Sequence, residues 1–222
     1  PFGNIYKEDG TPLTGNDDID LYRNAANWKS LRKSMLEGKR HRACKLCWDE
    51  EDNGMESKRQ NHNTVNEDLM VDMYLKTETD GTIDPDDFPI TYWDLRFGNK
   101  CNIKCRTCGP TDSDQWYGDW KSLGQGDTFN TKDGDTITIE EIAPDKFKTP
   151  DIFKWVDDSK LWDNIKTNIK KINRFYFTGG EPTVNIKHRE LLDFMITEDV
   201  AKDIVLEYNT NMVGIPDSVF TQ

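Results

Sequence analysis

The chain has 222 residues, a formal net charge of −12 and a hydrophobic fraction of 35%, with seven Trp and ten Phe. This many aromatic side chains can bury a core, which argues against a disordered chain. The negative charge is not offset by a basic stripe, which argues against a nucleic-acid partner. No apolar run reaches the roughly eighteen residues of a membrane span, and the opening residues lack signal-peptide regions. We therefore predict a cytoplasmic protein with no membrane partner.

Residues 1–20 are polar and rich in turn residues, and we predict a loop there. From Leu21 to Leu36 the apolar residues recur at helical spacing, and Gly38 is placed to end that helix. The following polar stretch resembles a connector, with a short helix predicted over 65–75. The sequence thus predicts an N-terminal region with its connector over 1–88 and a second domain over 89–222.

The second region alternates strand and helix patterns. The segment Ile90 to Phe97 alternates apolar and polar residues and predicts a strand. The later patterns predict a helix over 111–123, an insertion over 124–149 with a strand-like piece at 136–139, a helix opened by Pro150, a strand over 172–177, a helix over 187–196 and a strand over 204–208. Strands joined by helical crossovers are parallel, and such folds carry their chemistry at the carboxyl ends of strands.

The five cysteines fall into two groups, which are Cys44 with Cys47, and Cys101 with Cys105 and Cys108. Clustered cysteines in a cytoplasmic protein favour thiolate metal sites over disulfides. The second group follows the first predicted strand and places three thiols within eight residues. Three thiolates can hold three irons of a cubane cluster and leave the fourth iron open to another ligand. A structural zinc site is the weaker alternative, because zinc ribbons usually bring their cysteines in C-x₂-C pairs.

Two further motifs follow the next two predicted strands: Gly179-Gly180-Glu181-Pro182 and Asn209-Thr210-Asn211. The C-x₃-C-x₂-C run together with this Gly-Gly-Glu-Pro segment resembles the signature of the radical S-adenosylmethionine (SAM) superfamily. The resemblance implies an α/β fold, a partial (β/α) barrel that stops after about three strands, with a small N-terminal cysteine-containing region. The chain starts at Pro1 and stops at Gln222 just after a strand, so we expect it to be a fragment of a longer protein.

The same resemblance implies the site residues. Cys101, Cys105 and Cys108 would bind a [4Fe–4S] cluster whose open iron is chelated by SAM, and Gly179 to Pro182 would bind the amino group of its methionine moiety. The glycines allow close backbone approach, and Glu181 suits either a cationic ammonium or a supporting hydrogen-bond network. The alternative for this segment is a turn with no ligand role.

Thr210 and Asn211 are secondary cofactor-binding candidates. They resemble a Thr-Asn-Gly segment found near the cofactor in many members of the superfamily, with Met212 in place of Gly, and a plain polar turn is an equal alternative. A second departure is Thr107, because an aromatic residue commonly precedes the last cysteine and packs near adenine.

A second resemblance lies upstream, to the cysteine-bearing region of SPASM or twitch-type radical SAM proteins. It rests on Leu31-Arg32, Met35-Leu36, Gly38, Cys44-Lys-Leu-Cys47, Glu50/Glu51, Gly54, Ser57 and Arg59. It implies an auxiliary Fe–S cluster at Cys44 and Cys47. A structural zinc knuckle is the alternative, with His41 as the nearest histidine. Two thiolates are an incomplete ligand set, so we expect the remaining ligands to come from outside this chain.

The resemblance implies an enzyme that reductively cleaves SAM to a 5′-deoxyadenosyl radical, which abstracts hydrogen from a substrate. By analogy, a SPASM-like region favours a peptide or protein substrate, and a small-molecule substrate is the alternative. The implied partner is an electron donor such as flavodoxin or ferredoxin. The alternative function is a non-catalytic Fe–S or zinc-binding module, which would need neither Gly-Gly-Glu-Pro nor an open iron.

Overall fold

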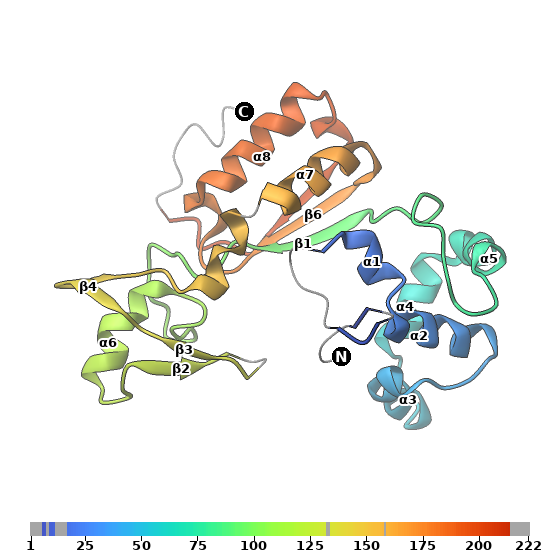
Figure 1. Cartoon of the computed structure of the whole chain (residues 1–222), viewed down its shortest axis with the longest axis horizontal. Coiled ribbons are helices and arrows are strands. Elements are labelled where there is room, and N and C mark those ends of the chain that lie inside the picture. The colour runs from blue at the N-terminus through green and yellow to red at the C-terminus, as the bar shows by residue number, and fades with distance from the viewer. Residues whose placement is uncertain (1–5, 8, 12–16, 132–133, 158, 214–222) are drawn as a thin grey trace. The chain divides into compact units, whose positions relative to one another are not determined.

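The computed structural model describes residues 6–7, 9–11, 17–131, 134–157 and 159–213. The chain is a mixed α/β protein that divides into two compact units, residues 1–89 and 90–222 (Figure 1). Within the described ranges, no helix combines the length and apolar character needed to cross a membrane.

The described part of the first unit is built from short helices. They are α1 (Ile19–Arg23), α2 (Ala26–Leu36), the 3₁₀ turn η1 (Arg42–Cys44), α3 (Lys45–Asp52), α4 (Lys58–Val65) and α5 (Glu67–Lys76). The single helix predicted from Leu21 is interrupted between α1 and α2. Asn24 lies at the break, where its side-chain amide donates to the Ile83 carbonyl at 2.8 Å and its side-chain oxygen accepts from the Ile83 N–H at 3.0 Å. This pairing with a distant backbone segment competes with continued helix.

The stretch that the sequence presents as a polar connector is more helical than predicted. Helix α4 opens with a capping box, in which the Ser57 hydroxyl accepts from the Gln60 N–H and the Gln60 side chain accepts from the Ser57 N–H. Most residues of α4 and α5 are exposed, the large apolar side chains of α5 among them. The helix predicted over 65–75 is found as α5, two residues later at its start.

The second unit contains a three-stranded parallel sheet. Its strands are β1 (Tyr92–Arg96), β6 (Arg174–Thr178) and β7 (Val205–Tyr208), in the order β1-β6-β7. The three predicted strands and their parallel orientation are confirmed. In register, Leu95 lies beside Phe177, which lies beside Tyr208.

Two helices, α7 (Ser159–Asn168) and α8 (Ile186–Thr197), pack on one face of this sheet (Figure 1). Phe97 stacks on Trp162 of α7 with ring centroids 6.1 Å apart, and Phe177 meets the edge of His188 of α8 at 5.0 Å. The helix predicted from Pro150 is instead a 3₁₀ segment, η3 (Asp151–Asp157), followed by α7. Two short 3₁₀ turns, η4 (Ile169–Lys171) and η6 (Ala201–Asp203), lead into β6 and β7.

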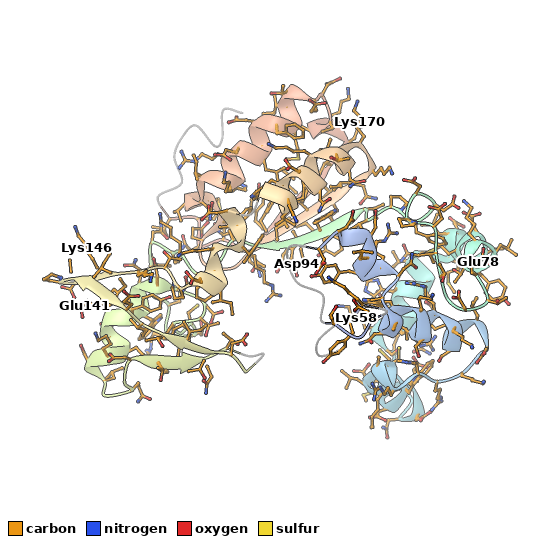
Figure 2. All side chains as sticks on the ribbon, in the orientation of Figure 1. Lys58, Glu78, Asp94, Glu141, Lys146 and Lys170 are labelled. Atoms are coloured by element: carbon orange, nitrogen blue, oxygen red, sulfur yellow. The ribbon has the colours of Figure 1, made fainter. Side chains whose placement is uncertain are left out.

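The predicted insertion forms two small antiparallel hairpins. They are β2 (Thr128–Asn130) with β3 (Thr136–Thr138), and β4 (Glu141–Ala143) with β5 (Lys146–Phe147). Glu141 and Lys146 lie on the second hairpin (Figure 2). The predicted helix over 111–123 is shorter, with the turn η2 (Asp114–Trp116) running into α6 (Tyr117–Ser122). A separate core of Tyr117, Phe129, Ile137 and Ile139 holds α6 and the first hairpin together.

Candidate functional site

The three motifs that follow strands meet at one edge of the parallel sheet. The cysteine loop leaves β1, the Gly-Gly-Glu-Pro segment leaves β6, and Asn209 to Asn211 leave β7. Direct contacts join them. The Glu181 N–H donates to the Lys100 carbonyl at 2.9 Å, and the Asn211 side-chain amide donates to the Cys101 sulfur at 3.8 Å. Residues more than one hundred positions apart in the chain therefore form one cluster.

Gly179 and Gly180 allow this close approach. Both have positive φ, at 76° and 37°. A Cβ on Gly179 would lie 2.8 Å from the Gly98 carbonyl oxygen, and one on Gly180 would lie 2.2 Å from the Lys100 carbonyl oxygen. Backbone atoms cannot yield to such contacts as a flexible side chain can. Glycine is required at both positions so that this turn can lie directly against the start of the cysteine loop.

The Glu181 carboxylate is 1% exposed and accepts hydrogen bonds from two sides. Oε1 accepts from the Thr183 N–H at 3.1 Å, the Thr183 hydroxyl at 2.7 Å and the Thr210 hydroxyl at 2.7 Å. Oε2 accepts from the Asn211 N–H at 2.8 Å. Burial alone would raise the pKa of this carboxyl, but the donors from Thr183, Asn211 and Thr210 lower it overall. Of the two roles that the sequence left open, the geometry matches the supporting hydrogen-bond network.

Pro182 is buried beside Glu181 and begins the 3₁₀ turn η5 (Pro182–Val184), for which Glu181 is the N-cap. We call Glu181, Thr183, Thr210 and the Asn211 backbone the carboxylate clasp. The clasp fixes the segment after β7 to the segment after β6.

The cysteine loop is also held from the side of η2. The Cys101 N–H donates to the Asp114 carboxylate at 3.2 Å, the buried Ser113 hydroxyl donates to the Ile103 carbonyl at 2.8 Å, and the Trp116 indole donates to the Cys105 carbonyl at 3.2 Å. Before the loop, Asn99 is 2% exposed. Its amide donates to the Pro110 carbonyl at 2.7 Å and to the Tyr117 hydroxyl at 2.6 Å. The loop is thus shaped by backbone-directed bonds that do not use its sulfurs.

Cys101, Cys105 and Cys108 are half-buried residues, and all three are free thiols. Burial raises the pKa of the Cys108 thiol, and the neighbouring Asp112, Cys105 and Cys101 raise it further. Among the described residues, no three His, Cys, Asp or Glu side chains are gathered so as to hold a single metal ion. A cubane cluster requires a different arrangement, because each thiolate binds a separate iron.

Cys44 and Cys47 lie where η1 passes into α3, three positions apart and both half-exposed. His41, the alternative zinc ligand, uses its Nδ1 to accept from the Ala43 N–H at 3.2 Å, and its Nε2 lies 3.4 Å from the Ser30 hydroxyl. Both ring nitrogens therefore already have local partners.

The other residues of the upstream resemblance pack beside this pair. Arg59 binds Glu51 through two hydrogen bonds of 3.0 and 2.6 Å and lies 4.2 Å above the Trp48 ring. Hydrogen bonds from Arg59 and from Ser57 lower the pKa of Glu51. These contacts tie α3 to α4 and need no metal to form.

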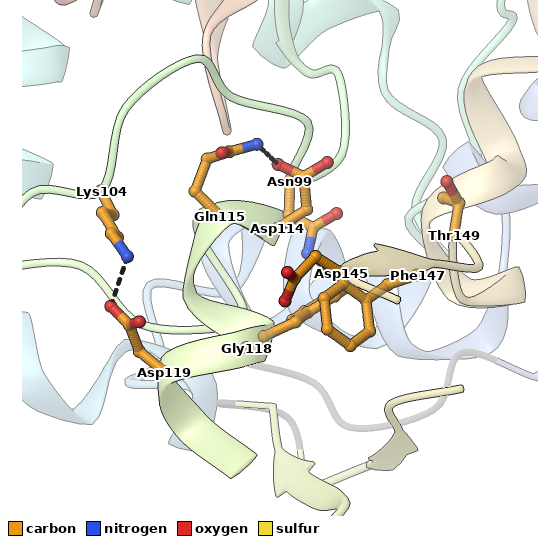
Figure 3. A pocket seen from close by; sticks show the side chains of 10 residues that line it. Asn99, Lys104, Asp114, Gln115, Gly118, Asp119, Asp145, Phe147 and Thr149 are labelled. Atoms are coloured by element: carbon orange, nitrogen blue, oxygen red, sulfur yellow. Dashed lines mark hydrogen bonds and ion pairs between the residues drawn. The ribbon is translucent and has the colours of Figure 1, made fainter. Parts of the chain in front are cut away.

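A polar cavity of about 270 Å³ lies on the η2 side of the cysteine loop (Figure 3). It is bounded by the loop, by η2 with α6, and by the β4–β5 hairpin with Thr149. In it the Lys104 ammonium lies 2.6 Å from the Asp119 carboxylate. Asp114 and Asp145 add negative charge to the lining. The cavity is large enough for a small polar group, and its lining favours a cation.

Comparisons with protein-family models, with curated proteins and with solved structures found no match to this chain. The structure brings together Cys101, the Gly179–Pro182 segment, Thr210 and Asn211, and it places Cys44 and Cys47 in the other unit.

Sequence reasoning missed Thr183, Asp114 and Asn99, which hold the motifs in place. Only Thr183 carried a local signal, because a Glu followed two residues later by Thr has the spacing of a side-chain cap.

Proposed function

We propose that this chain binds a [4Fe–4S] cluster and SAM as a radical SAM enzyme does, with its parallel sheet forming part of a (β/α) barrel. The observation that carries the proposal is the meeting of the three motifs at the carboxyl edge of one sheet. Cys101 contacts Asn211, and Lys100 contacts the backbone of Glu181. Parallel topology brings the three segments to one edge, and the glycine turn and the Asn211–Cys101 contact then join them directly.

The residues present fit the cluster and SAM. Cys101, Cys105 and Cys108 are free thiols on one loop and would each hold one iron, which leaves the fourth iron for SAM. When bound, the cluster would pass one electron to SAM, so that the C–S bond to the adenosyl carbon breaks into methionine and a 5′-deoxyadenosyl radical that removes hydrogen from the substrate. The electron would come from a donor such as flavodoxin or ferredoxin.

The chain's own residues would orient SAM. Gly179 and Gly180 bring the backbone after β6 against the cysteine loop, where their carbonyls can accept from the amino group of SAM. The carboxylate clasp would hold that turn rigid, because the Glu181 carboxylate accepts hydrogen bonds from Thr183, Thr210 and Asn211. A peptide, protein or small-molecule substrate would meet the same edge.

The test is anaerobic reconstitution of the chain with iron and sulfide. We expect about four irons per chain, a four-iron cluster signal on reduction, and 5′-deoxyadenosine on addition of SAM and dithionite. The Cys101→Ala/Cys105→Ala/Cys108→Ala variant should lose all three. Leu123→Ala, an exposed change in the same unit, is the matched control and should keep them.

The rival functions give different results in the same experiment. A four-iron cluster that produces no 5′-deoxyadenosine would indicate a non-catalytic Fe–S module. Bound zinc in place of iron would indicate a zinc module, and a four-iron signal that survives in the triple variant would reject the assignment of the ligands.

A further inference from the structure

We infer that Asn211 is a positioning residue that acts through Cys101, raising the reduction potential of the cluster by an N–H···S hydrogen bond. The inference rests on the proposed function and adds to it a role that neither the cysteine motif nor the Gly-Gly-Glu-Pro segment contains. By the resemblance alone, Asn211 would be a contact to the cofactor. Its bonds in the structure point instead to the sulfur.

The side-chain amide of Asn211 and its backbone N–H are all engaged. The two hydrogens of its side-chain amide serve the Cys101 sulfur at 3.8 Å and the Asn102 side-chain oxygen at 2.9 Å. Its side-chain oxygen accepts from the Val213 N–H at 2.8 Å, and its backbone N–H donates to Glu181 at 2.8 Å. A side-chain amide held at three points, on a backbone held at a fourth, can present its N–H to one sulfur without freedom to turn away.

The carboxylate clasp supplies this rigidity. Glu181 reaches the segment after β7 at two successive residues, through the Thr210 hydroxyl and the Asn211 N–H. The same residue is fixed to the start of the cysteine loop by its own N–H on Lys100. Glu181 therefore helps to set the distance between Asn211 and Cys101, although the hydrogen bonds of its carboxylate go to Thr183, Thr210 and Asn211.

The direction of the effect follows from charge. One-electron reduction of the cluster adds negative charge that spreads onto the cysteine sulfurs. A donor aimed at a sulfur stabilises the reduced form more than the oxidised form, which raises the potential. A side chain at 211 that has no N–H donor removes this stabilisation, and a carboxylate there also repels the negative charge on the sulfur.

The experiment measures the midpoint potential of the reconstituted cluster in the full chain by titration with dithionite, together with iron content. Asn211→Ala removes the donor but keeps the backbone bond to Glu181. Asn211→Asp has nearly the same shape and keeps the acceptor for Val213, but replaces the amide by a negative oxygen. Met212→Ala is the control, because this neighbouring side chain is 60% exposed in the same turn.

We expect the potential to fall in the order wild type, Asn211→Ala, Asn211→Asp, with unchanged iron content and with Met212→Ala equal to wild type. The iron–cysteine stretching bands should shift in the same order. If the substitutions only loosened the loop, the midpoint potentials of Asn211→Ala and Asn211→Asp would not differ according to the charge at position 211. If the wild type binds the cluster but its midpoint potential is the same in both Asn211 variants, this inference alone is overturned. If the wild type binds no four-iron cluster, the proposed function is overturned and this inference with it.

Discussion

Glu181 is the residue in which motif and structure are most closely connected. A carboxylate excluded from water is unfavourable unless hydrogen-bond donors compensate it. Here the donors come from the segment after β6 and from the segment after β7. The sequence identified Glu181, Thr210 and Asn211 separately, as parts of two motifs. It could not show that they bind one another, because their separation of about thirty residues is closed only by the pairing of β6 with β7.

Glu181→Gln should destabilise the second unit and make the stability of this unit less dependent on pH. The amide offers one acceptor oxygen where the carboxylate offers two, so a buried donor loses its partner, at a cost of about 1–3 kcal/mol. The pKa of Glu181 is lowered from 4.5 in the folded chain, so its stabilisation is present above that pH and is lost as the pH falls through the folded pKa. Gln cannot ionise, so the variant lacks this acid-sensitive part.

The measurement is the hydrogen-exchange protection of the Asn211 amide and the free energy of unfolding, at about pH 7 and about pH 4. Glu190→Gln makes the same chemical change in an exposed ion pair with Lys187 and should alter stability by less than about 0.5 kcal/mol. Equal Asn211 protection in wild type and Glu181→Gln would show that the clasp does not hold the turn.

Among the elements, those with strong internal patterns were predictable. The alternation in β1, β6 and β7 and the apolar face of α8 place them within about two residues of their predicted bounds. The broken helix at Asn24, the exposed helix α4 and the 3₁₀ start before α7 were not predicted. The break at Asn24 is determined by a distant backbone segment, to which its side chain bonds. Helix α4 is marked in the sequence by its capping box and not by an apolar face.

The insertion is the element whose role was least visible in the sequence. Its short strands carry few apolar residues, but Phe129, Ile137 and Ile139 converge on Tyr117 of α6. Burial raises the pKa of the Tyr117 hydroxyl to about 12, so it stays protonated while it accepts from Asn99. The insertion is thereby linked through Tyr117 and Asn99 to the start of the cysteine loop.

Phe129→Ala should release the first hairpin and loosen the cysteine loop. Phe129 is 6% exposed, and truncation of a buried Phe costs about 3–5 kcal/mol. Hydrogen exchange should accelerate first in β2 and β3 and then at the Cys101 amide. Leu123→Ala, at 67% exposure, should leave both unchanged. Faster exchange in the hairpin with an unchanged Cys101 amide would show that the insertion is independent of the site.

For the whole molecule, the division into two units separates the two groups of cysteines. The contact boundary falls after residue 89, and the sequence composition had placed it after residue 88. The resemblance that assigns an auxiliary cluster to the first unit depends on Cys44 and Cys47, the two cysteines among its 89 residues. The structure adds that the neighbouring Arg59 pairs with Glu51 and lies over the Trp48 ring.

The last prediction is that the 222-residue chain binds one cluster, at the second group of cysteines. Each iron of a cubane needs a thiolate or a substitute, and two thiolates leave half of the positions without one. His41 would have to give up its bonds to Ala43 and Ser30 to help. Reconstituted Cys44→Ala/Cys47→Ala should therefore retain about four irons per chain, as wild type does, with the same reduced-cluster spectrum. Iron and zinc are both counted, and the triple variant at Cys101, Cys105 and Cys108 sets the baseline. If the double variant loses iron, the first unit holds a cluster of its own; if it loses zinc, the pair is a structural zinc site.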